Sequence, residues 1–204
     1  MTNNADSLKE DISFLRSLAE AGRRGPLVGA TWLVAAGAIF GTAPLIHWLF
    51  MIRGVATENI VATIYLSATV LFVATGIIST IIFRERFIRA ADTANRAFAI
   101  AWQAAGYGSF IVSLCAWILE LRSHTPFAFW MTWAGSLCLY GGAWLVCWRI
   151  TLRQWMFWVA MASYLVAIVG VLLPVGPNLL LVFSASILSL ALVPGLYLMF
   201  GEAH

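Results

Sequence analysis

Charged residues are scarce in this sequence of 204 residues, and their scarcity argues against a water-soluble globular protein. Only 10% of the residues are Asp, Glu, Lys or Arg, whereas 62% are hydrophobic. Soluble domains carry about 25% charged residues. The few charges lie mostly between long apolar stretches. The composition therefore fits a chain that is buried in a lipid bilayer over most of its length.

Residues that support chemistry inside a membrane are also missing or misplaced. The Asp residues lie outside the apolar stretches, and no Lys lies within one, so aspartyl chemistry and a retinal Schiff base both lack their reactive group. The histidines are not paired as haem ligands, and Ser184 has no His on the stretches that follow it. The cysteines form no Cys-x-x-Cys motif and fit small packing residues. We therefore expect no enzyme, no cofactor and no metal site.

Six apolar stretches are each long enough to cross a bilayer as a helix. About 20 residues suffice, because a hydrocarbon core of about 30 Å is crossed at 1.5 Å per residue. Helices are required because lipid offers no partners to backbone groups, and the stretches are too long and too uniformly apolar for barrel strands. We predict an all-α polytopic membrane bundle whose short connections make neighbouring helices antiparallel. The predicted spans are Leu27–Ile52, Asn59–Phe83, Ala94–Leu121, Phe127–Trp148, Trp155–Leu173 and Asn178–Phe200.

Basic residues predict the orientation of these spans. Ten of the twelve Lys and Arg fall on the side of the N-terminal segment and the second and fourth connections, and only Arg53 and Arg122 fall on the other side. By the positive-inside rule, both termini are cytoplasmic. The ten tryptophans fall into two belts near the span ends, which suits interface anchors. The compact chain with short connections suggests a bacterial inner membrane.

Residues 1–26 precede the first span and read as a separate cytoplasmic segment, whereas residues 27–204 form the six-helix transmembrane domain. Ser7 and Glu10 make a capping-box pattern, which predicts a helix start. Apolar residues then recur at three- and four-residue spacing from Leu8 to Leu18, with charged residues between them. This pattern is typical of an amphipathic helix that lies in the lipid interface or covers the ends of the spans.

Small residues and prolines within the spans predict helix contacts and kinks. Gly37 and Gly41 form a Gly-x-x-x-Gly motif, which fits either a dimer contact or internal packing. Internal packing is favoured, because a polytopic chain supplies its own neighbouring helices. Pro44 and Pro194 each remove a helix donor, which frees the carbonyls of Phe40 and Leu190. Interrupted helices at such positions mark the substrate site in some transporters, although geometry alone also tolerates them.

Two polar groups of residues are the candidate sites. Gln103 and Tyr107 share one face of the third span and are expected to face the bundle interior, where they line a ligand cavity or bond to a neighbouring helix. His47, Glu120 and His124 collect on the outer side. They match no metal-ligand spacing, so solvated interface residues are favoured over an incomplete metal or proton-relay site.

Two functions remain compatible with the sequence. The first is a non-catalytic interaction or accessory protein with a cytoplasmic face that docks a partner or binds anionic lipid. The second is a small solute transporter, or the substrate-binding subunit of one, with its cavity near Gln103 and Tyr107. The expected partners are the bilayer and either another membrane protein or further copies of the chain, and nucleic acid is not among them. The basic residues assigned to the cytoplasmic face are Arg23, Arg24, Arg84, Arg86 and Arg89.

Overall fold

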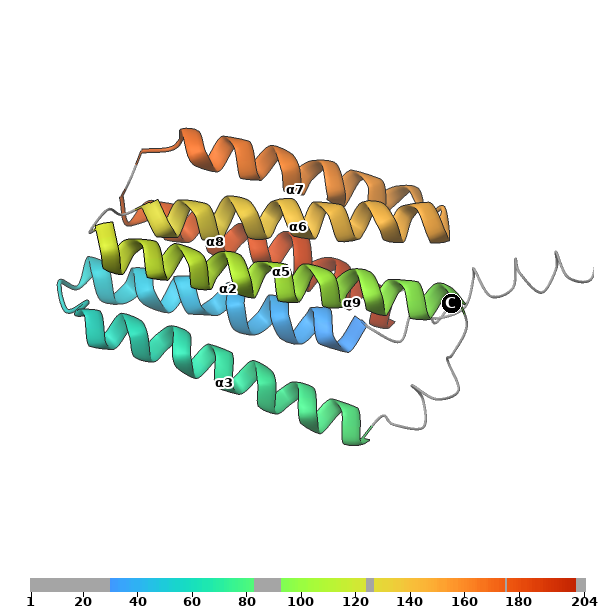
Figure 1. The fold of residues 1–204 in the computed structure, drawn as a ribbon, viewed down its shortest axis with the longest axis horizontal. Helices are drawn as coiled ribbons and strands as arrows, with labels where there is room; N and C mark the ends of the chain where they lie inside the picture. The colour runs from blue at the N-terminus through green and yellow to red at the C-terminus, as the bar shows by residue number, and fades with distance from the viewer. Residues whose placement is uncertain (1–29, 83–92, 124–126, 175, 201–204) are drawn as a thin grey trace, which may run out of the picture.

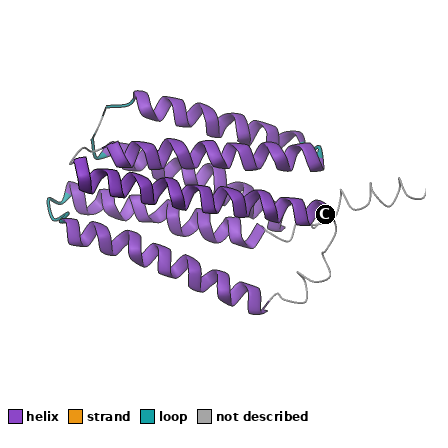
Figure 2. Ribbon diagram, in the orientation of Figure 1, coloured by secondary structure: helices purple, strands orange, loops and turns teal. Residues whose placement is uncertain are grey.

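The computed structural model describes residues 30–82, 93–123, 127–174 and 176–200, and in these ranges the chain is helical without strands (Figures 1 and 2). The all-α prediction is therefore confirmed for the described part of the chain. The last helical rod is interrupted by a short π-helix, η1. The elements are α2 Ala30–Ile52, α3 Glu58–Ile82, α5 Thr93–Ser123, α6 Phe127–Thr151, α7 Gln154–Leu172, α8 Asn178–Ile187, η1 Leu188–Leu192 and α9 Val193–Phe200.

Five of the described helices are long and apolar enough to cross a membrane. They are α2, α3, α5, α7 and the continuous rod that runs from α8 through η1 to α9. Helix α6 has 25 residues but is not among these five, because Trp, Tyr and Gly lower the hydropathy of its apolar stretch. Its length alone would allow it to span.

The helices lie roughly antiparallel in two groups (Figure 1). In the first group, α2 contacts α3, α8, η1 and α9. In the second group, α6 lies between α5 and α7. Helix α7 also contacts α8 and η1, which links the groups. Since each connection between consecutive described helices is short, the chain reverses direction at each end of the bundle, as predicted.

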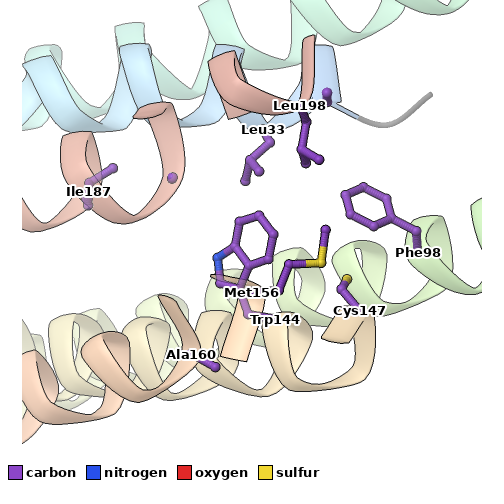
Figure 3. Packing of buried hydrophobic residues seen from close by; sticks show 10 residues of the cluster. Leu33, Phe98, Trp144, Cys147, Met156, Ala160, Ile187 and Leu198 are labelled. Carbon is purple, nitrogen blue, oxygen red and sulfur yellow. The ribbon is translucent and has the colours of Figure 1, made fainter. Parts of the chain in front are cut away.

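A core cluster of apolar side chains joins the two groups. Trp144 and Met156, from α6 and α7, lie opposite Leu33 and Leu198, from α2 and α9 (Figure 3). Phe98 of α5 closes the same cluster. Trp144 is completely buried, so its ring is shared by helices of both groups.

Two tryptophans depart from the predicted interface belts. Trp133 and Trp144 are fully buried, whereas Trp117 and Trp158 remain exposed on the sides of the bundle. The ring of Trp133 lies directly over Gly170 of α7, where any side chain would collide with it. The assignment of Trp133 and Trp144 to the interface is therefore wrong. The flat ring of Trp133 fills the space that Gly170 leaves in the core. The position of Trp133 along its span does not predict this contact.

Candidate functional site

The π-helix η1 ends at Leu192, two residues before Pro194, and contacts both α2 and α7. Proline has no N–H and cannot bond to the carbonyl of Leu190, as the sequence predicted. In the structure this carbonyl accepts a hydrogen bond from Nε1 of Trp144, at 3.3 Å. The carbonyl that Pro194 frees therefore has a hydrogen-bond donor within the protein. Short π-helical turns inside α-helices occur often at functional sites, but here the turn serves an internal contact.

The second proline lies in a similarly closed environment. Pro44 is buried inside α2. Three residues earlier, the carbonyl of Gly41 accepts a hydrogen bond from Oγ of Ser184 on α8, at 2.6 Å. Pro44 and Pro194 are thus both buried, and the polar groups next to them bond across the bundle. Their surroundings resemble a packed helix contact more than a ligand cavity.

Gly37 and Gly41 lie where α2 crosses η1. A Cβ atom on Gly37 would lie 2.5 Å from the backbone nitrogen of Leu192, and one on Gly41 would lie 2.7 Å from Cδ2 of Leu188. From the other side, a Cβ on Gly195 would lie 3.0 Å from the backbone nitrogen of Val34. The motif therefore packs within the chain, which is the alternative that the sequence analysis favoured over a dimer contact. Glycine is needed because two backbones approach each other here.

Gln103 and Tyr107 do not face the bundle interior, so that expectation is wrong for the described chain. Gln103 is exposed, and Tyr107 retains 72% of its accessible surface. Helix α5 packs on α6 through its opposite face, which includes the buried residue Ala105. At about 100° per residue, positions 103 and 107 lie about 160° from that contact. The polar pair therefore lines no cavity within the described helices.

The outer-side group is only partly described, because His124 lies outside the described residues. His47 is half-buried, and its Nδ1 lies 3.2 Å from the hydroxyl of Tyr65 on α3, with the two rings edge to face. Glu120 is exposed on α5. No cluster of three His, Cys, Asp or Glu side chains suited to a metal occurs among the described residues. The contact of His47 is therefore a link between α2 and α3.

The N-terminal segment 1–26 and all five arginines assigned to the docking face, Arg23, Arg24, Arg84, Arg86 and Arg89, lie outside the described residues. Two other arginines at the α6–α7 turn are described. The guanidinium of Arg149 lies 4.9 Å from the ring centroid of Trp148. The pKa of Arg153 is lowered by burial, and a smaller electrostatic interaction with Tyr197 partly offsets this shift. A basic, aromatic turn thus lies at the end of the bundle where the sequence places the cytoplasm.

Two side chains that bridge the helices were not predicted from the sequence. Trp144 was assigned to the interface, and Ser184 was considered only as a nucleophile. A usable signal existed for Trp144, since the carbonyl freed by Pro194 needs a buried donor and an indole supplies one. No pattern in the sequence marks the partner of Ser184, because a serine in a helix also bonds to its own backbone.

Several hydroxyl groups of the described interior donate hydrogen bonds to backbone carbonyls. Thr151, Ser163 and Ser186 each donate to the carbonyl four residues earlier. Among the described residues, buried polar atoms without a hydrogen-bond partner include the hydroxyl of Ser109 and the indole N–H groups of Trp48 and Trp148, which belong to three different helices. The interior therefore offers little convergent polar chemistry to a solute or a reaction.

Two hollows lie on the sides of the bundle, and apolar side chains line both. One lies between α2 and α3, beside Trp32 and Gly76. The other lies between α6 and α7, beside Cys138 and Val171. Comparison with protein-family models, with curated proteins and with solved structures finds no match.

Proposed function

We propose that this chain is an integral membrane protein that crosses the bilayer six times, with both termini in the cytoplasm of a bacterium. Five helices of suitable length and composition support insertion. Helix α6 is proposed as the sixth span because it lies between α5 and α7, which are themselves long and apolar enough to cross. The bias of Lys and Arg toward one side supports the orientation.

Within the membrane, the proposed role is that of a non-catalytic interaction or accessory protein. The observation that carries this proposal is the contrast between interior and exterior. Inside, Trp144 and Ser184 use their donors on backbone carbonyls of the same chain. Outside, α3 exposes a long row of aliphatic side chains, including Leu66 and Ile77. Binding surface is therefore available on the sides and ends of the bundle, and the packed interior offers few groups for a substrate.

The test is native mass spectrometry of the protein released gently from its own membrane, with bound proteins, lipids and small molecules recorded together. A stoichiometric protein partner is expected. A retained small solute without any protein partner would contradict the accessory role and favour the solute transporter instead. Orientation is tested separately by accessibility of single cysteines in sealed vesicles, with one at Arg53 and one at Arg153. Opposite labelling of these two sites is expected, and labelling from the same side would refute the topology.

A further inference from the structure

The outward face of α5 carries a regular row of side chains that the chain itself leaves uncovered. The row, here called the α5 seam, alternates in steps of four and three residues along the helix. Such alternation is the heptad spacing of two helices that pack side by side. The contact of α5 with α6 lies on the opposite face, at Phe98 and Ala105. The α5 seam consists of Gln103, Tyr107, Phe110, Leu114, Trp117 and Leu121.

The seam places two polar side chains deep in the proposed membrane. The middle residue of α5 is Gly108, so Tyr107 lies about 1.5 Å and Gln103 about 7.5 Å from the helix centre along its axis. Within the described part of the chain, neither side chain has a hydrogen-bond partner. An amide or hydroxyl that faces hydrocarbon without a partner is strongly unfavourable. A polar group from outside the described part of the chain is therefore expected at this depth.

Gly106 lies beside the seam and is exposed. A Cβ atom there would meet nothing within 4 Å. Two residues away, a Cβ on Gly108 would lie 2.9 Å from Leu139 of α6, so the small size of Gly108 is explained within the chain. Glycine weakens a helix relative to alanine. Close approach of an external helix would account for glycine at position 106.

We propose that the α5 seam binds the α5 seam of a second copy of this chain, as a parallel pair about a two-fold axis along the membrane normal. Copies inserted in the same orientation have parallel α5 helices, and in a parallel pair each seam residue faces its own counterpart. The Gln103 amide has both a donor and an acceptor, so two copies satisfy each other at equal depth. The proposal rests on the membrane insertion proposed above.

Disulfide cross-linking in native membranes tests the seam directly. In full-length protein with Cys115, Cys138 and Cys147 replaced by alanine, Leu114→Cys lies on the seam. Leu165→Cys on α7 is the matched control, because Leu165 is also exposed and apolar, at 61%. Oxidation is expected to trap a covalent dimer of the Leu114→Cys protein and to leave the Leu165→Cys protein monomeric. Equal cross-linking at both positions would refute the assignment of the interface.

Two glycine variants separate association from folding. Gly106→Leu is expected to leave thermal stability unchanged and to raise the dimer dissociation constant at least tenfold, measured by single-molecule photobleaching during dilution in lipid. Gly108→Leu is expected to lower the folded yield, because its side chain meets Leu139. Gln103→Leu should weaken the dimer by about threefold to twentyfold, the range typical of hydrogen bonds between membrane helices.

The outcomes distinguish this proposal from the function on which it rests. A monomer that resists carbonate extraction and labels with the expected topology would overturn the seam dimer and leave membrane insertion standing. A different protein cross-linked stoichiometrically to Leu114→Cys would overturn the second copy as the occupant. Release of the chain by carbonate would refute insertion itself. A trapped dimer whose yield Gly106→Leu lowers is the expected result.

Discussion

Replacement of Gly37 by alanine tests the central contact of the fold, where α2 meets η1. The added Cβ would lie 2.5 Å from the backbone nitrogen and 2.7 Å from Cα of Leu192. Backbone atoms of a packed helix cannot rotate away as the end of a side chain can. The substitution therefore forces the two helices apart and disturbs the neighbouring hydrogen bond between Ser184 and Gly41.

The expected magnitude follows from two opposing effects. Overpacking of a tight core costs about 1–3 kcal/mol. Alanine has a higher helix propensity than glycine, and this offsets the cost by about 1 kcal/mol. Because the added Cβ meets backbone atoms, the upper part of that cost applies, about 2–3 kcal/mol, and we expect Gly37→Ala to lower the free energy of unfolding by about 1–2 kcal/mol. Gly41→Ala should cost less, because its Cβ meets the movable tip of Leu188.

The assay is titration of the detergent-solubilised protein with sodium dodecyl sulfate, followed by circular dichroism. Gly142→Ala on α6 is the control, since its Cβ would lie 3.8 Å from the Tyr164 hydroxyl, an ordinary contact. The control should be neutral or slightly stabilising. If Gly37→Ala and Gly142→Ala gave the same unfolding midpoint, the close approach of α2 and η1 would be refuted.

Three further substitutions test individual contacts by the same titration. Ser184→Ala removes the 2.6 Å hydrogen bond to Gly41 and should lower the free energy of unfolding by about 0.6 kcal/mol, with Ser186→Ala as the control because Ser186 bonds within its own helix. Trp144→Phe removes the donor to the Leu190 carbonyl and leaves a cavity, so a loss of about 2–4 kcal/mol is expected, and an unchanged stability would show that the indole does not bridge the helices. Tyr65→Phe removes the hydroxyl beside His47 at the partly exposed end of α2 and should cost less than about 1 kcal/mol; a larger loss would mean that this contact holds α3 to α2.

The helical class and the positions of the helices were predictable from the sequence because both depend on local properties. A long apolar stretch must bond its own backbone groups when water is absent, and a helix achieves this within one segment. For the same reason, the effect of Pro194 on the carbonyl of Leu190 could be inferred from spacing along the chain. The internal role of Gly37 and Gly41 was favoured by an equally simple argument, that the chain offers its own helices first.

Only the tertiary structure decided which face of each helix is buried. The helices carry apolar residues on all sides, so periodicity gives no direction to the core, and Gln103 and Tyr107 were assigned inward because they are polar. Because α5 packs on α6 through its opposite face, both side chains lie on the outside of the bundle instead. Likewise, the burial of Trp144 depends on a carbonyl 46 residues further along the chain. The sequence alone thus determined which segments are helical, whereas packing between distant segments determined which side chains form the core and which remain available to a partner.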